Sequence, residues 1–391
     1  MCAKEIALRY GFNPHQKPAR IFVKSGDLPF KVVNGAPGYI NMLDALNSWQ
    51  LVKELKQSLN LPAAASFKHV SPAGAAVGIP LTDTLKRAYF VDDMEESPVM
   101  AAYARARGAD RVSSYGDFVA VSDTVDGPTA KLIVREVCDG MIAPGYEKGA
   151  LEILKAKKNG KFLLIEIDPD YEPDETETRE VFGVQMEQMR NNAVATPDLL
   201  KDVVTRKKDF PPDAVRDLII ATAAIKYTQS NTIGFAVDGQ VIGIGAGQQS
   251  RIHCTRLAAE KADRWYLRQH PTILDIKFKP GVSRADKNNA IDLYFQERLN
   301  KFERETMEAA MVDVPPQLTY DQKKDWLKGL KGVSLSSDGM IPFRDTIDRA
   351  DESGVEYVLQ PGGSIRDEGV IKACDDYGMV MAFSNLRLFH H

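Results

Sequence analysis

The sequence predicts a mixed α/β fold, because strand-like and helix-like apolar patterns alternate along the whole chain. Its 391 residues are too many for one ordinary hydrophobic core and are enough for two domains. Apolar residues make up 44% and charged residues 27%, which is the composition of a folded globular protein. We therefore expect α/β or α+β architecture in two domains.

The first half begins with a helix and a buried strand. Residues 41–59 carry apolar side chains at helical spacing, and the small apolar run 63–68 is typical of a buried strand. Pro72 and Gly74 are expected to end that strand. Two further elements are predicted in this half, a helix over 129–137 and a strand over 162–167.

Two breaks in composition indicate the domain boundary. Residues 168–180 combine two prolines with dense acidic side chains, which is typical of an exposed connection. The segment 207–212 precedes a strong helical pattern. We place the boundary between these breaks, so that the first domain spans 1–195 and the second spans 196–391. Halves of similar size suit a duplication, although the residues themselves show none.

The second half contains a hairpin between two helices. Residues 232–237 and 240–244 flank Asp238-Gly239, a residue pair preferred in tight hairpin turns. A helix over 213–227 precedes the hairpin, and a long helix over 250–268 follows it.

Charge and cysteine usage exclude several classes of protein. The net charge of −4 argues against a dedicated nucleic-acid binder. The cysteines are far apart and form no CxxC pair, and neither H-x-E nor P-C-x-x-C occurs, so we expect no disulfide framework and no zinc site. No apolar run approaches the ~18–20 residues of a membrane span, and no signal peptide is visible, so we expect a cytoplasmic protein without membrane partners.

The glycine-rich segment 243–247 is a weak match to a dinucleotide-binding loop. Its third glycine comes too early for GxGxxG, and no acidic residue follows in a later strand at the required spacing. No GxxxxGK[ST] loop occurs either. The sequence therefore gives little support to a nucleotide cofactor or a P-loop ATPase.

Lys68 and His69 form the most chemically suggestive pair. Both ionisable groups sit among small and apolar residues, and burial would favour their neutral forms. A surface strand end with a capping histidine explains the pair equally well. Because consecutive strand residues point to opposite faces, the two side chains can share one site only if the strand ends at them.

Other polar residues stand in turns or at helix ends, and each alone is explained as a turn or cap. The segments taken together, however, resemble one family over nearly the whole chain: the AICAR transformylase (5-aminoimidazole-4-carboxamide ribonucleotide formyltransferase) part of the bifunctional purine-synthesis enzyme. The resemblance rests on residues 8–11, 13–16, 33–35, 66–78, 105–117, 226–231, 243–256 and 386–391.

The resemblance implies transfer of a formyl group from 10-formyltetrahydrofolate to the 5-amino group of AICAR, which gives FAICAR and tetrahydrofolate on the way to IMP. It implies a pair of cytidine-deaminase-like domains that lack the zinc site, and a homodimer whose active sites straddle the subunit interface. It also suggests a bound potassium ion, which no residue pattern here predicts.

The family's functional positions carry over to named residues. The resemblance implies His69 as general base, Lys68 as partner of the oxyanion, and Asn231 as the residue that holds the histidine or the carboxamide in register. The implied contacts to the ribonucleotide come from Arg9, Tyr10, Gly116, Asp139, Met340 and Arg387. The implied contacts to the folate come from Arg251, Ile252, Asp345, Ser364 and Ile365.

Two departures from the family pattern bear on function. The bifunctional enzyme carries a cyclohydrolase domain before the segment that matches Arg9, so we expect no IMP cyclohydrolase activity here. Met340 stands where some relatives have an aromatic substrate contact. A transformylase fragment of the bifunctional enzyme and a non-catalytic nucleotide-binding dimer remain alternatives, although a binding module needs neither a base nor an oxyanion partner.

Overall fold

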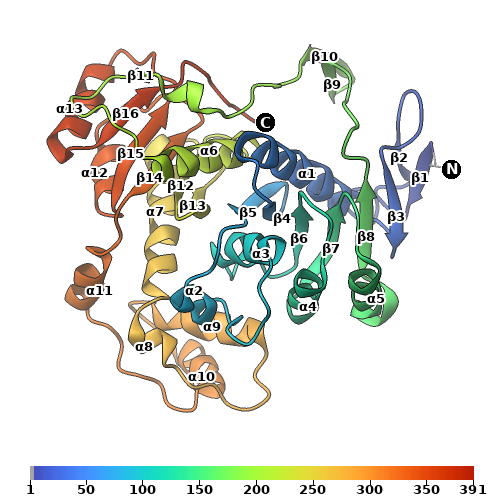
Figure 1. The fold of residues 1–391 in the computed structure, drawn as a ribbon, viewed down its shortest axis with the longest axis horizontal. Helices are drawn as coiled ribbons and strands as arrows, with labels where there is room; N and C mark the ends of the chain where they lie inside the picture. Colours follow the sequence, from blue (N-terminus) through green and yellow to red (C-terminus); the bar gives the residue numbers. More distant parts are fainter. Residues whose placement is uncertain (1–3) are drawn as a thin grey trace.

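The computed structural model describes residues 4–391 and confirms the mixed α/β fold. A twelve-stranded sheet in the order β11-β16-β15-β14-β12-β13-β5-β4-β6-β7-β8-β3 runs through the molecule (Figure 1). Its strands are β3 (Phe30–Asn34), β4 (Ala63–Lys68), β5 (Ser71–Val77), β6 (Asp117–Val121), β7 (Cys138–Ala143), β8 (Leu163–Ile167), β11 (Asp202–Val203), β12 (Ile233–Val237), β13 (Gln240–Gly245), β14 (Val333–Ser337), β15 (Val355–Gln360) and β16 (Val380–Phe383). Two separate hairpins pair β1 (Glu5–Leu8) with β2 (Ala19–Phe22) and β9 (Thr176–Val181) with β10 (Val184–Met189).

Helices cover both faces of the large sheet. One face packs against α1 (Tyr39–Leu59) and α6 (Pro212–Lys226). The other packs against α3 (Pro98–Gly108), α4 (Gly127–Arg135), α5 (Lys148–Ala156), α7 (Arg251–Leu267), α12 (Asp345–Asp351) and α13 (Asp367–Tyr377). The remaining helices are α2 (Asp83–Ala88), α8 (Pro271–Leu274), α9 (Arg284–Tyr294), α10 (Lys301–Ala310), α11 (Tyr320–Leu327) and the 3-10 turns η1 (Lys157–Gly160) and η2 (Pro197–Leu200). The segment from α8 to α11 encloses a small apolar core of its own, at the bottom of Figure 1.

The two halves of the sheet repeat one topology. In the first half, β3 is antiparallel to β8, β4 is antiparallel to both β5 and β6, and β6, β7 and β8 are parallel. In the second half, β11, β12, β13, β14, β15 and β16 follow the same pairing rules in the same order. Helices α1 and α6 occupy equivalent places before the central hairpins. The structure thus shows a duplication that the residues conceal, while the division at residue 195 stays a prediction.

The halves meet along a short joint. β13 pairs with β5 through one residue pair, Gln240 with Ala76. Gln240 begins β13 and Ala76 lies near the end of β5. The pairing is therefore at the opposite end of β5 from the turn that joins it to β4. A second connection lies on the face covered by α1 and α6. There the buried Lys226 on α6 forms an ion pair with the buried Glu54 on α1 at 2.7 Å.

Most predicted elements are confirmed within a residue or two. The strand 63–68 and the Asp238-Gly239 hairpin are both present, and the turn residues have φ of +53° and +75°. The prediction that Pro72 and Gly74 end the strand is wrong, since both lie inside β5. Gly74 is required there for a different reason: a Cβ at this position would approach the carbonyl oxygen of Ala106 on α3 to 2.1 Å.

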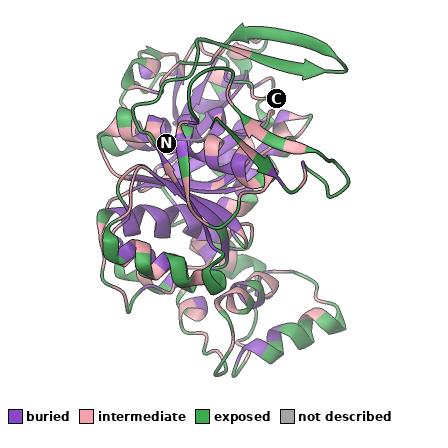
Figure 2. Ribbon diagram, turned by 90° about the vertical axis from the view of Figure 1, so that its right-hand side faces the viewer, coloured by how far each residue is buried: buried purple, intermediate pink, exposed green. Residues whose placement is uncertain are grey.

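The segment predicted as an irregular exposed connection contains the hairpin β9–β10. It projects from the body with every residue of β10 exposed, as the green ribbon at the top of Figure 2 shows. Its turn is Phe182-Gly183, and Phe182 is fully exposed. The described cysteines, Cys138, Cys254 and Cys374, are free and buried, while Cys2 lies outside the described residues. None of the helices in residues 4–391 combines the length and the apolar character that a membrane crossing requires.

Candidate active site

His69 stands in a two-residue turn between β4 and β5. Lys68 pairs with Ser71 across the hairpin, and the two residues between them, His69 and Val70, have φ of +54° and +59°. Positive φ at both central positions is the geometry of a type I′ turn, which normally uses Asn or Gly. For a β-branched residue such as Val70, this conformation is strained. The strand therefore ends at Lys68, and the turn removes the strict alternation of faces.

Lys68 is tied to the loop before β6. Its Nζ donates to the carbonyl oxygen of Tyr115 at 2.6 Å, and Gly116 follows with φ of +76°. Lys68 is half-buried and His69 is exposed, so the neighbouring side chains of this chain do not bury the imidazole. An anchored ammonium and an accessible imidazole on consecutive residues can bind and polarise an anionic or carbonyl group.

Asp44 on α1 supports the turn, and this residue was not singled out in the sequence analysis. Its Oδ1 accepts the backbone N–H of Val70 at 2.7 Å, from the buried face of α1. Burial raises the pKa of Asp44 to about 6, although the Val70 N–H and the nearby His69 oppose the rise and Asp139 adds to it. The signal in the sequence was a carboxylate within an apolar helical pattern, where charged residues are rare.

Asp139 lies near this turn on β7. Its carboxylate forms an ion pair with Lys158 at 2.9 Å, and it is close enough to Asp44 to affect that residue's titration. The structure thus brings together Lys68, His69, Gly116 and Asp139, four of the predicted site residues, which we call the turn cluster.

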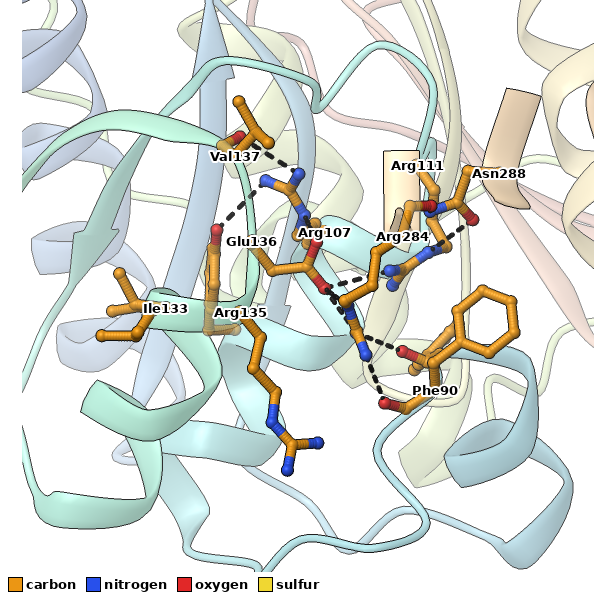
Figure 3. A network of polar contacts seen from close by, with 12 residues as sticks. Phe90, Arg107, Arg111, Ile133, Arg135, Glu136, Val137, Arg284 and Asn288 are labelled. Atoms are coloured by element: carbon orange, nitrogen blue, oxygen red, sulfur yellow. Dashed lines mark hydrogen bonds and ion pairs between the residues drawn. The ribbon is translucent and has the colours of Figure 1, made fainter. Parts of the chain in front are cut away.

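A buried ionic network supports the loop of Gly116. Asp117 accepts from Arg107 at 2.6 Å, and Arg107 also reaches Glu136 at 3.1 Å. Arg111 and Arg284 bond the same Glu136 at 3.0 and 2.5 Å, as Figure 3 shows. Burial opposes the ionisation of Glu136, but these arginines prevail and hold its pKa at about 2. The network fixes the start of β6 and thereby the carbonyl that holds Lys68.

A cavity of about 320 Å³ collects a second group of predicted residues. We call this group the cavity cluster: Asn231, Arg251, Ile252, Met340 and Asp345 all line the cavity. Arg251 is buried, and its guanidinium bonds the Asn231 side chain at 2.9 Å and the carboxylate of Asp338. Arg251 therefore holds Asn231 in place from inside the fold.

The C-terminal segment closes one wall of this cavity. Phe389 lines it, and the Arg387 guanidinium stacks over the Phe389 ring at 4.8 Å. The segment is anchored because the Leu388 N–H donates to the carbonyl oxygen of Asp338 at 2.9 Å. An arginine near a chain end is usually solvated and mobile, and here the backbone beside Arg387 is fixed.

The remaining predicted residues belong to neither cluster. Ser364 and Ile365 stand in the loop after β15, where Arg366 stacks over Phe343 of the cavity wall at 4.8 Å. Arg9 and Tyr10 follow β1, and the nearby Phe12 contacts Tyr39 at the start of α1, with ring centroids 4.7 Å apart.

No hydrogen bond or ion pair joins the turn cluster to the cavity cluster within residues 4–391. The last residues of β4 and the first residues of β12 lie at the same end of the strands, but β5 and β13 stand between them in the sheet. Three strand spacings amount to about 14 Å. The two clusters are therefore separate groups of residues within one chain.

Comparison with known proteins identifies the family. The model of the AICARFT/IMPCHase bienzyme family matches residues 1–261. This chain belongs to that family. The bifunctional purine biosynthesis proteins PurH of two strains of Xanthomonas campestris pv. campestris, strain 8004 and strain ATCC 33913, are each 31% identical to it. The alignments cover 99% of this chain and 58% of each relative, so the chain spans somewhat more than half the length of these family members.

Proposed function

We propose that the chain transfers a formyl group from 10-formyltetrahydrofolate to the 5-amino group of AICAR. The observation that carries the proposal is the turn cluster, where an anchored lysine and an accessible histidine occupy consecutive positions at a strand end. Formyl transfer needs a base for the attacking amine and a partner for the developing oxyanion, and this pair can supply both. The alternative, a non-catalytic nucleotide-binding dimer, leaves that pairing without a purpose.

In the proposed reaction, the amine nitrogen attacks the formyl carbon and a C–N bond forms. The amine is a poor nucleophile because it is conjugated with the imidazole ring, so His69 accepts its proton as attack proceeds. The formyl oxygen becomes an oxyanion, which the Lys68 ammonium stabilises; one such group contributes about 3–4 kcal/mol. Collapse breaks the bond to N10 of the folate, and the proton passes to that nitrogen, which gives FAICAR and tetrahydrofolate.

The cavity cluster is proposed to bind the rest of both substrates. Asn231 would orient the reacting groups, and the folate would lie along Ile252, Asp345, Ser364 and Ile365. The ribonucleotide phosphate would meet Arg9, Tyr10 and Arg387, since a guanidinium matches phosphate geometry. Met340 is exposed at the cavity, where it can offer its backbone or a flexible apolar contact.

We further propose that a second copy of the chain completes each site. Two observations support a homodimer: the two clusters stand about 14 Å apart within one chain, and the hairpin β9–β10 exposes apolar side chains that a monomer leaves in water. These include Val181, Phe182, Val184, Met186 and Met189. An isolated two-stranded hairpin is marginal in water, so a partner surface would stabilise it.

A spectroscopic assay of tetrahydrofolate release tests the proposed function. We expect turnover by the wild type with both substrates present, and a loss of about 10²–10⁴ in kcat for His69→Ala. Wild-type protein that binds AICAR without releasing tetrahydrofolate would refute the enzyme claim. Conversion of FAICAR to IMP is followed in the same samples. A bound potassium ion and a cytoplasmic location are proposals from the resemblance and the sequence.

A further inference from the structure

The same hydrogen bond from a helix side chain supports the central hairpin in each half. In each half, the sixth residue of the helix before the hairpin is an aspartate that accepts the backbone N–H of the second turn residue. Asp44 on α1 receives the N–H of Val70 at 2.7 Å, and Asp217 on α6 receives the N–H of Gly239 at 2.8 Å. Asp217 therefore provides a comparison for Asp44, because it supports a hairpin turn outside the proposed active site.

The two aspartates differ in their surroundings. Asp217 bonds the Arg216 guanidinium at 2.9 Å and supports an Asp-Gly turn, a sequence suited to positive φ. Asp44 has no ion pair with any residue from 4 to 391, and it supports His69-Val70, a sequence that disfavours the same turn. Asp217 thus has a cation of its own, whereas Asp44 has none among residues 4–391.

Two ionisable side chains interact with Asp44. His69 faces it from the turn and favours its ionised form, while Asp139 faces it from β7 and opposes ionisation. The ion pair to Lys158 on η1 engages Asp139, and the bond to the Tyr115 carbonyl engages Lys68 on β4. Of the proposed catalytic pair, His69 is accordingly the residue that interacts electrostatically with Asp44.

We infer that Asp44 is a positioning residue for His69: its carboxylate holds the left-handed turn and supplies the negative charge that stabilises the imidazolium formed when His69 takes the proton. The inference rests on the proposed function for its catalytic meaning. Burial that raises the pKa of Asp44 to about 6 still leaves the carboxylate ionised at neutral pH. A buried charge kept without a dedicated cation is costly, and a role at the site accounts for that cost.

Asp44→Asn isolates the charge, because the amide oxygen can still accept the Val70 N–H. The matched control is Asp217→Asn in the other half. The first readout is NMR titration of ¹³C-labelled histidine, with the His69 signal assigned by its loss in His69→Gln. We expect the His69 midpoint to fall by about 0.5–1 pH unit in Asp44→Asn and to stay in place in Asp217→Asn.

The second readout is the pH profile of kcat in the formyl-transfer assay. We expect kcat to fall about tenfold or more in Asp44→Asn, with the acid limb moved to lower pH and KM for AICAR little changed. An unmoved His69 midpoint in Asp44→Asn overturns the inference, as does an unmoved kcat profile in an active enzyme. An inactive wild type refutes the proposed function instead, and the NMR titration still decides the link between the residues. If Asp44→Asn fails to fold, the same pair is compared in a Val70→Gly background, where the turn no longer strains a β-branched residue.

Discussion

Val70 and Asp44 show how single residues shape the candidate site. A non-glycine residue in the left-handed region costs about 1–2 kcal/mol, and a β-branched residue is unusual there. The hydrogen bond from the Val70 N–H to Asp44 holds that conformation. A carboxylate buried for this purpose carries an energetic cost of its own, which leads to a prediction about stability.

Asp44→Asn should make the protein more stable at pH 8. The folded-state pKa of Asp44, about 6, exceeds its unfolded value of 3.8, so the folded state holds a proton that the unfolded state has lost between these values. Stability therefore falls as pH rises through this window, by about 1–3 kcal/mol, and asparagine avoids the loss. Thermal unfolding of both proteins at pH 4 and pH 8 measures the effect. A variant that is no more stable at pH 8 than the wild type would contradict this account of the site.

The sequence revealed the candidate pair but not its setting. The run 63–68 predicts a strand that ends at Lys68, and Asp238-Gly239 predicts a hairpin turn, because both signals are local. The turn at His69-Val70 is not locally encoded, since the β-branched Val70 disfavours positive φ. It forms because α1 packs under the hairpin and presents Asp44, a tertiary contact that periodicity cannot reveal.

Among the elements, the network around Glu136 joins parts that are distant in sequence. Glu136 follows α4, Arg107 lies on α3, and Arg284 belongs to α9 in the helical segment that follows α8. Arg284 also donates to the carbonyl oxygen of Phe90 at 2.7 Å. This set of bonds attaches the segment from α8 to α11 to the first half of the sheet (Figure 3).

Glu136→Gln should therefore destabilise the protein by about 3–5 kcal/mol at pH 7, because it leaves buried guanidinium groups without their anion. The folded-state pKa of about 2 lies below the ordinary 4.5, so the wild type loses this contribution as pH falls from about 4.5 toward 2, and the variant does not. Denaturant unfolding at pH 7 and pH 3.5 measures both effects. As a control, Asp93→Asn removes only a surface pair with Arg135 and should cost less than about 1 kcal/mol. Equal effects of the two substitutions would refute the role of the network.

The hairpin β9–β10 marks a limit of local prediction at this scale. Its acidic, proline-containing approach indicates a loop, and neither strand buries a face against the body of the chain. A pattern that reports burial cannot reveal strands that lie in solvent. The same reasoning explains why the duplicated topology escaped notice, since it resides in strand pairing and not in matching residues.

At the scale of the whole molecule, the separation of the turn cluster from the cavity cluster is the central feature. The strand order fixes this separation, and the short joint between β13 and β5 does nothing to close it. A second copy of the chain can bring the turn cluster of one protomer to the cavity cluster of its partner, as expected of a symmetric dimer.

Mixed dimers test that arrangement. His69→Ala damages the turn cluster and Asn231→Ala damages the cavity cluster, so each homodimer should be inactive. If sites are shared, each mixed dimer contains one intact site, and random mixing should restore about a quarter of wild-type activity. Subunit exchange followed by the tetrahydrofolate assay gives the answer. Mixed dimers that form, as shown by differently tagged subunits, and yet remain inactive would place the whole site within one chain.

The most direct test of the account follows the formyl carbon itself. Protein supplied with AICAR and 10-[¹³C]formyltetrahydrofolate is predicted to transfer the label to the 5-amino nitrogen of the ribonucleotide, seen by NMR as a new formamide carbon. The same experiment with His69→Ala or Lys68→Met should show little or no transfer while AICAR still binds. Label that stays on the folate with the wild type, or that moves equally fast in both variants, would contradict the assignment of formyl transfer to Lys68 and His69.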